Sequence, residues 1–369
     1  MTTLPARYAL GVLLALLAAG AARAQSVSSH CDRSNFSECL NGVSTSVTNG
    51  ANLRINSETN ADVARKRLKR DAGDEMQAAM GRPQSGLSSG DLLGGWSAWV
   101  NYRGSWYDSD FVFNNESLAY DADTDRGTVG LDRLIYDDRF LVGLSLGYED
   151  TDTDTFYNGG GQDSDGFTIA PYGAWLINDN FSIDVSGGYT PLEYDQERIS
   201  PTDGTTTSSS FDADRWFFAT NLNALAIVNN WVLGGRIGFL YTQEQQDGYV
   251  ETGSAASAAA GTVRTVDDRD IDLTQLVLGG DIAYSFGALE PYALLIYRND
   301  LSRDNGEDAG GLPGAFTSVQ PDDDDEIEAG FGFRLFSSFG VTSSFEWSII
   351  EGRDSFDGHN VSLTIRGEL

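Results

Sequence analysis

The sequence predicts an all-β fold, a twelve-stranded antiparallel transmembrane β-barrel preceded by one short helix. Three observations carry this prediction. Apolar residues recur at every second position over residues 94–369, every second connection between these segments is short, and the apolar positions carry very few charges. Period-two alternation indicates strands, because successive side chains of a strand point to opposite faces, whereas a helix repeats every 3.6 residues.

Composition excludes several classes of function. The chain has 369 residues, with 24 Lys and Arg against 55 Asp and Glu, a formal net charge of −31. A charge of this sign repels polyanions, so no nucleic-acid partner is predicted. The histidines are His30 and His359 and the cysteines Cys31 and Cys39, too few for multi-histidine or thiol-rich metal centres, so no metal and no cofactor are predicted.

Residues 1–24 have the pattern of a cleaved export signal. Arg7 precedes an apolar run at residues 8–20, and Ala22 and Ala24 form a small-x-small cleavage site before Gln25. The run is shorter than the roughly 20 residues that a membrane-spanning helix needs. The mature chain is therefore expected in an exported, oxidising compartment.

Residues 25–59 form a short Ser-, Thr- and Asn-rich segment. Its cysteines, Cys31 and Cys39, are expected to form a small disulfide loop in an oxidising compartment. A pair of free, reactive thiols is the alternative.

Residues 60–93 predict a basic helix and a linker. Asn60 suits the N-cap, the helix runs to Met80, and Gly81 and Pro83 follow as stop signals. Five cations in six residues crowd this helix: Arg65, Lys66, Arg67, Lys69 and Arg70. A solvated, fraying helix is the simplest interpretation of that run.

Residues 94–369 form the barrel, with 14 Arg against 47 acidic residues. Twelve strands are predicted, at about 95–107, 119–136, 139–155, 165–177, 181–197, 210–228, 231–246, 268–286, 289–302, 325–336, 341–353 and 359–369. Short connections alternate with long, acidic ones, which is typical of a membrane barrel with tight periplasmic turns and longer external loops. An even strand count returns both ends of the barrel to one side.

The two faces of the strands indicate which solvent each one meets. One face is bulky, aromatic and almost uncharged, as hydrocarbon requires, while the other carries small residues and charges of both signs that can pair across a lumen. A water-soluble periplasmic all-β protein is the alternative. The charged residues expected to face the lumen include Arg103, Asp184, Arg236, Glu328, Arg334, Glu346 and Arg366.

Several stretches resemble the C-terminal β-domain of autotransporters, the translocator unit of type V secretion. They are YDADTDRGTVGLD, LVGLSLGYEDTDTDT, DGFTIAPYGAWL, DRDIDLTQLVLGGDIAY, EPYALLIYR, PDDDDEIEAGFGFRLF and NVSLTIRGEL. The resemblance implies a twelve-stranded barrel in the outer membrane of a Gram-negative-type envelope, assembled by the barrel-assembly machinery and surrounded by lipid and lipopolysaccharide. It also implies that the helix at residues 60–80 lies in the pore, with its cations near lumen carboxylates, and that the N-terminal segment is carried to the surface.

Two features depart from that family. Residues 25–59 offer only 35 residues as a passenger, without β-solenoid repeats, so the barrel is expected to export or anchor a short segment. The last strand has outward residues Val361, Leu363 and Ile365 as an assembly signal, but the chain ends in Leu369 where outer-membrane barrels normally end in an aromatic residue.

No catalytic function is predicted. His359 lacks a serine two residues away, and a surface position at an external loop is expected for it. The run Asp150, Asp152, Asp154 lacks the glycine and glutamate of an EF-hand loop, so solvated loop tips are expected rather than a calcium site. The alternative function is a stand-alone, porin-like channel or structural barrel, with residues 25–93 left in the periplasm.

Overall fold

The computed structural model describes residues 95–369, except for positions 111, 114–115, 118, 137–138, 157, 179, 305–323, 338–340 and 354. The predictions for residues 1–94, namely the export signal, the Cys31–Cys39 disulfide, the basic helix and its five cations, lie outside the described residues. So do most of the predicted connection at residues 305–323 and the short turn at residues 338–340.

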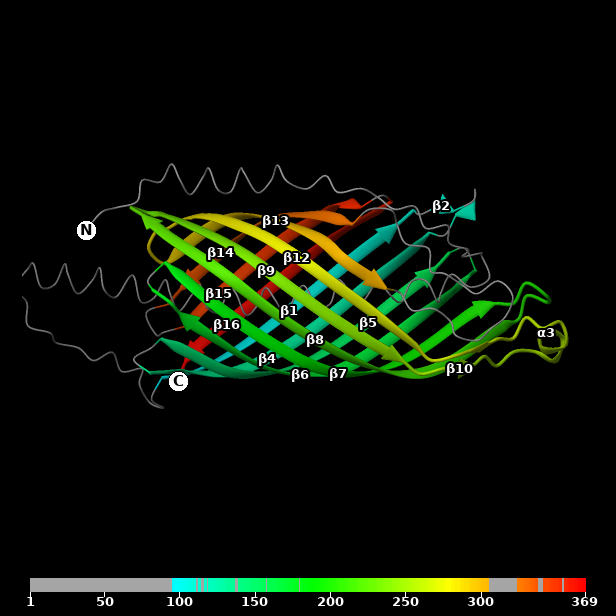
Figure 1. Ribbon diagram of the computed structural model, residues 1–369. Coiled ribbons are helices and arrows are strands. Elements are labelled where there is room, and N and C mark those ends of the chain that lie inside the picture. The colour runs from blue at the N-terminus through cyan, green and yellow to red at the C-terminus, as the bar shows by residue number, and fades with distance from the viewer. Residues whose placement is uncertain are drawn as a thin grey trace, which may run out of the picture.

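Twelve long strands form one closed antiparallel barrel, which confirms the predicted fold class (Figure 1). In the order around the barrel, the strands are β1 (Trp96–Ser109), β16 (Phe356–Glu368), β15 (Val341–Arg353), β14 (Asp325–Phe336), β13 (Leu289–Asp304), β12 (Arg269–Tyr284), β9 (Trp231–Gln246), β8 (Thr206–Val228), β7 (Phe181–Ile199), β6 (Gly160–Leu176), β5 (Phe140–Thr155) and β4 (Tyr120–Ile135). Consecutive long strands pair with one another, and β1 pairs with β16, from Ser97 with Glu368 to Ser109 with Phe356.

The predicted strand limits agree with these bounds to within a few residues, apart from the start of β6, which is Gly160 rather than residue 165. The connection between β9 and β12, predicted as a plain loop, contains β10 (Tyr249–Val250), α3 (Ala255–Ala259) and β11 (Thr265–Val266). Another small hairpin, β2 (Val112–Phe113) and β3 (Glu116–Ser117), lies between β1 and β4. Such two-residue strands are too short to produce a periodic signal.

The outward face is apolar across the middle of the barrel. Exposed large apolar side chains occupy alternate positions, for example Val142, Leu144 and Leu146 on β5 and Leu233, Ile237 and Phe239 on β9. Burying these residues in lipid accounts for their exposure, since a water-soluble surface rarely carries a continuous apolar band of this extent. Among the described residues, no helix has the length and apolarity needed to cross a membrane.

Two aromatic girdles bound the apolar band. At the rim of the short turns, Phe140 stacks on Trp175 with ring centres 6.1 Å apart. Further along the same strands, Tyr148 lies 4.9 Å from Phe167. Residues 140–148 and 167–175 each span nine positions between the girdles, which matches the roughly 9–11 residues of a tilted transmembrane strand.

Tyrosines of the second girdle donate hydrogen bonds to outward aspartates on the neighbouring strand. The Tyr102 hydroxyl lies 2.5 Å from Asp125, and Tyr241 lies 3.0 Å from Asp272. From this level outward the apolar face becomes acidic. Asp150, Asp152 and Asp154 lie on exposed positions of β5, so the prediction of loop tips is wrong for them, because strand pairing continues beyond the membrane.

An outer lobe extends the barrel at the end opposite the short turns and the C-terminus (Figure 1). It consists of residues 192–213 of the β7–β8 hairpin together with residues 247–268, and β7 and β8 are the two longest strands, with 19 and 23 residues. A small apolar core holds it together, formed by Leu192, Tyr194, Phe211, Ala213, Tyr249 and Val266.

Candidate functional site

The inner wall of the barrel is the candidate site, because it concentrates buried charged side chains of both signs. Inward positions of the strands alternate with the lipid-facing ones, so each wall residue is placed by strand parity. Two ion-paired groups of wall residues form what we call the charge belt: Glu244, Arg215, Glu149 and Arg126 in one, and Arg103, Glu328, Arg298, Glu326, Arg353, Asp300 and Arg303 in the other.

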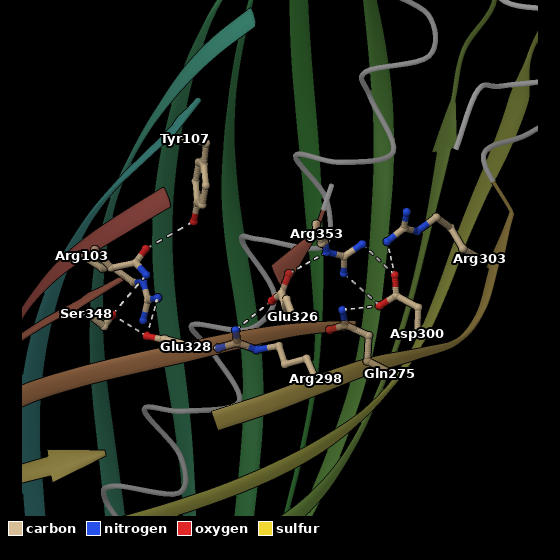
Figure 2. Close-up of polar contacts among 11 residues, drawn as sticks. Arg103, Tyr107, Gln275, Arg298, Asp300, Arg303, Glu326, Glu328, Ser348 and Arg353 are labelled. Atoms are coloured by element: carbon tan, nitrogen blue, oxygen red, sulfur yellow. Dashed lines mark hydrogen bonds and ion pairs between the residues drawn. The ribbon is translucent and has the colours of Figure 1, made fainter. Parts of the chain in front are cut away.

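The larger group spans β1 and β13–β15 (Figure 2). Arg298 donates to Glu326 at 2.8 Å and also pairs with Glu328. Arg353 donates through Nε to the other oxygen of Glu326, again at 2.8 Å. Glu326 and Arg298 are both buried, so each charge is stabilised by a partner rather than by water.

Further contacts complete this group at both ends. Arg353 also contacts Asp300 at 3.1 Å, and Arg303 pairs with the same carboxylate. Gln275 of β12 donates to Asp300 at 2.7 Å. At the β1 end, Arg103 lies 3.8 Å from Glu328, which also accepts from Ser348 at 2.5 Å. Figure 2 shows these side chains converging from four neighbouring strands and β1.

The smaller group lies on β4, β5, β8 and β9. Arg126 pairs with Glu149, and Arg215 donates to Glu149 at 2.5 Å and to Glu244 at 2.8 Å. Tyr194, which reaches in from the outer lobe, donates to Glu244 at 2.8 Å. Arg215 is 2% exposed and Glu244 0%, so this chain of charges is sealed from bulk water.

A third cluster, the seam latch, ties the last strand to β4 and β6 across β1. Arg366 of β16 makes a bidentate pair with Asp132 of β4, at 2.8 and 2.5 Å. Tyr172 of β6 donates to Asp132 at 2.7 Å and accepts from the indole of Trp99 at 2.7 Å. A methyl group at Gly130 would overlap the Trp99 ring, so glycine is required where the indole lies flat on the wall.

The remaining predicted lumen residues also lie on inward positions with polar partners. Asp184 accepts from Asn221 at 2.7 Å and from Asn223 at 2.6 Å. Arg334 lies 3.4 Å from Glu290, with its guanidinium 3.9 Å above the Tyr292 ring.

Tyr292 in turn donates to Glu346 at 2.9 Å. Arg236 is half-buried on β9, with its side chain packed over Gly279.

Three wall residues were not among those predicted from the sequence: Arg126, Arg215 and Glu244. The alternation of inward and outward positions could have identified them, because each is a charged residue at an inward position, as Arg103 is. Trp99 breaks the apolar parity of β1 in the sequence, and its partner is Tyr172. No local pattern indicates that partner, because β1 and β6 are far apart in sequence and not adjacent in the barrel.

His359 lies on β16 rather than in an external loop, so that prediction is wrong. Its ring stacks on Trp106 with centres 5.0 Å apart and an interplanar angle of 16°. Both side chains are on the outward face, away from the wall residues. Within the described part of the chain, no three or more His, Cys, Asp or Glu side chains are grouped to hold a metal ion.

The outer lobe has its own buried ion pair. Arg198 binds Glu251 through two hydrogen bonds, at 2.8 and 2.6 Å, and donates to the carbonyl of Thr262 at 2.6 Å. Nearby, hydrogen bonds from Ser254 and Thr205 lower the pKa of Asp203 to about 2. The lobe is therefore a packed structure beyond the membrane.

Comparison with known proteins agrees with this architecture. Residues 98–346 match the family described as Autotransporter beta-domain. The fold is similar to the translocator domain of autotransporter NalP from Neisseria meningitidis, with a TM-score of 0.61, 12% identity, and coverage of 84% of this chain and 98% of that one. It is also similar to the beta domain of the Bordetella autotransporter BrkA, with a TM-score of 0.55, 16% identity, and coverage of 74% and 100%. At these identities the structural likeness concerns the fold alone. No curated protein sequence matches the chain.

Proposed function

This chain belongs to the autotransporter β-domain family, and from that premise we propose that its outer-membrane barrel moves its own short N-terminal segment to the cell surface and anchors it there. The observation that carries the proposal is a closed barrel whose inner wall is lined with charged, hydrogen-bonding side chains. Such a wall suits a polypeptide, whose backbone groups need polar partners wherever water is excluded.

The basic helix predicted at residues 60–80 then occupies the lumen after export. Arg65, Lys66, Arg67, Lys69 and Arg70 would meet carboxylates of the wall, of which Glu328, Glu346 and Asp184 are the candidates named from the sequence. An exported arginine or lysine gains from such contacts because opposite charges attract strongly where the dielectric constant is low. Catalysis is not part of this function, and we expect the barrel itself to be inactive as an enzyme.

The partners follow from the same proposal. Residues 1–24 direct export, and the barrel-assembly machinery inserts the barrel, reading the outward residues of β16, among them Leu363, Ile365 and Leu369. Leu363 and Ile365 are 44% and 42% exposed on the lipid side. Lipid and lipopolysaccharide surround the apolar band.

Surface labelling tests the exported segment directly. A peptide tag inserted near Ser28 of the full-length chain should react with an impermeant reagent on intact cells. A tag in the short turn at residues 229–230, on the periplasmic rim, is the matched control and should react only after the outer membrane is opened. A tag near Ser28 that stays unreactive on intact cells would contradict the proposal and favour the porin-like channel.

Channel conductance tests whether residues 60–80 fill the lumen. Deleting residues 60–80 should raise the single-channel conductance of the purified barrel, because the vacated lumen would admit water and ions. Heat-modifiable mobility on gels would verify that the shortened chain still forms a barrel. Unchanged conductance in a folded deletion variant would show that this segment is not a plug.

A further inference from the structure

The inner wall of the barrel loses its charges beyond the second aromatic girdle, on the side of β1 and β4–β6. We call this part the outer wall. It consists of the inward residues of four neighbouring stretches, bounded on β7 by Gln196: residues 105–109 of β1, 120–124 of β4, 151–155 of β5 and 160–164 of β6. Hydroxyl and amide side chains predominate on it, among them Thr151, Thr153, Thr155 and Gln162, and no inward position of these stretches carries a charged residue.

The outward face of the same four stretches has the opposite composition. All their acidic residues lie there and are exposed, namely Asp108, Asp121, Asp123, Asp152, Asp154 and Asp163. The membrane does not require this separation, because the stretches lie beyond the girdle, where either face could carry charge. Charges are costly where they are buried without a counter-charge. An uncharged, buried inward face therefore indicates a contact from which charge is excluded.

Two side-chain atoms at the edge of the outer wall have no hydrogen-bond partner within the described part of the chain: Gln162 Nε2 and Gln196 Oε1. Gln162 and Gln196 are Cα partners on β6 and β7, and both are 8% exposed. The amide nitrogen of Gln196 is already used, since it donates to Ser209 at 2.8 Å. Buried amide groups are nearly always hydrogen-bonded in folded proteins, so a matching contact supplies an acceptor for Gln162 and a donor for Gln196.

The chain's own N-terminal segment contains a stretch of matching chemistry. Residues 39–53 are the longest run without a charged residue between the predicted cleavage site and β1. Within this run, residues 41–53 have the sequence NGVSTSVTNGANL, with four hydroxyl and three amide side chains. Peptide groups, hydroxyls and carboxamides supply both donors and acceptors. This stretch can therefore satisfy the outer wall without bringing a charge to it.

Chain connectivity brings the same stretch to the height of the outer wall. Residues 81–95 lead into the start of β1 at the rim of the short turns, so a helix at residues 60–80 in the lumen has its N-terminus toward the cell surface. A helix of 21 residues is about 32 Å long, close to the hydrocarbon thickness of a bilayer. Residues 41–59 then follow near the second girdle. The outer wall begins there, three residues beyond Tyr102 on β1 and Tyr148 on β5.

We propose that the outer wall is the docking site for residues 41–53 of the same chain, so that only residues 25–40 project from the cell surface. The inference rests on the proposed function, because it requires export of the segment with residues 60–80 in the lumen. It adds how the exported segment is held: by an uncharged contact in which its hydroxyl, amide and peptide groups bind Gln162, Gln196 and their neighbours.

Thiol reactivity on intact cells tests the docking. In the full-length chain with Cys31→Ser and Cys39→Ser, Ser46→Cys lies in the docked stretch and Ser28→Cys in the projecting part. An impermeant maleimide should modify the Ser46→Cys variant at least about tenfold more slowly, because a buried thiol reacts only when its contact opens. Equal rates would overturn the inference and leave the proposed function standing. If neither thiol reacts until the outer membrane is opened, both fail.

Adding charge to the outer wall provides a second measurement. Gln162→Glu combined with Gln196→Glu should bring the Ser46→Cys rate to within about twofold of the Ser28→Cys rate, because buried carboxylates disfavour an uncharged contact. Gln243→Glu combined with Gln245→Glu, on the outward face of β9, makes the same charge change as a control and should leave the rate slow. Heat-modifiable mobility verifies folding. A rate that stays slow in the folded wall variant would overturn the inference.

Cross-linking locates the contact without changing any charge. Ser46→Cys is combined with Thr153→Cys on the outer wall or, as the control, with Thr128→Cys, a buried inward position of β4 on the other side of the Arg126–Glu149 pair. A short bis-maleimide should join the Thr153 pair at least about fivefold more, because docking raises the effective concentration of one thiol near the other. Equal yields would overturn the inference. So would a protected Thr153→Cys beside a freely reactive Ser46→Cys, since another occupant, such as a saccharide, would then cover the wall.

Discussion

Buried charge inside this barrel is stable because most guanidinium groups on the wall meet a carboxylate within hydrogen-bond distance. The seam latch is the most complete case. Asp132 is 0% exposed and accepts two bonds from Arg366 and one from Tyr172. Removing one partner of such a pair leaves the other buried and uncompensated, which costs far more than an exposed ion pair contributes.

The latch predicts a large loss of stability from one substitution. Asp132→Ala should lower the free energy of unfolding of the barrel by about 3–5 kcal/mol, because the Arg366 charge loses its buried carboxylate. The temperature at which the folded gel band disappears would report the change. Asp108→Ala, at an exposed outward position of β1, is the control and should shift stability by less than about 0.5 kcal/mol. Similar effects for the two variants would rule out a special role for the latch.

At the scale of elements, β7 and β8 extend beyond the other strands of the barrel and form a folded outer lobe with residues 247–268. Rings of Tyr194, Phe211 and Tyr249 stack at 4.8 Å spacing within its apolar core. The bidentate Arg198–Glu251 pair anchors the returning segment to β7. Since this pair lies outside the membrane and is not part of the charge belt, residues 247–268 should be able to detach from the hairpin while the barrel stays folded.

This separation predicts a local effect of Glu251→Ala. Loss of the carboxylate leaves Arg198 buried without its main counterion, so residues 247–268 should become sensitive to protease on intact cells. Glu193→Ala, at an exposed outward position of the same hairpin, should leave them resistant. The barrel's heat-modifiable mobility should be the same in both variants, and a loss of the folded band in Glu251→Ala would show that lobe and barrel are one cooperative unit.

At the scale of the whole molecule, three surfaces meet three environments: an apolar band in lipid, a charged wall in the lumen, and an acidic outward face beyond the second aromatic girdle. Outside the membrane, partial burial and the neighbouring carboxylate of Asp108 raise the pKa of Asp121. Partial burial and Asp152 likewise raise the pKa of Asp123. The carboxylates of this face therefore repel one another.

These shifts predict a gain of stability on mild acidification. A raised carboxyl pKa means that the folded protein binds protons more tightly than the unfolded chain, so the free energy of unfolding should rise as the pH falls from neutral through the folded-state pKa. Asp203 acts in the opposite direction only near pH 2–4, because its pKa is lowered to about 2. Denaturant unfolding in detergent between pH 7 and pH 5 would measure the slope.

The matched variant for this test is Asp121→Asn combined with Asp123→Asn. It should be more stable than the original chain at pH 7, and its stability should depend less on pH, since two self-repelling carboxylates are gone. Added salt should narrow the difference by screening. If the free energy of unfolding of this variant depends on pH as steeply as that of the original chain, groups other than Asp121 and Asp123 cause the pH dependence.

The sequence by itself determined the barrel, the number of strands and which face of each strand meets lipid. These properties are local: alternation on one strand, such as Phe140 to Tyr148 on β5, reports the two solvents directly, and short turns reveal which strands are paired. Charges at inward positions, such as Arg103 and Arg366, were accessible to the same reasoning.

Only the tertiary structure decided which wall residues meet. Arg366 and Asp132 are 234 positions apart, and their contact depends on barrel closure and on the stagger between strands, which no local pattern encodes. The outer lobe could not be predicted from the sequence either. Its two-residue strands and five-residue helix are too short to show a periodic pattern, and long-range packing stabilises them. The meeting of Arg103 with Arg126 at the β1–β4 junction also follows from register alone.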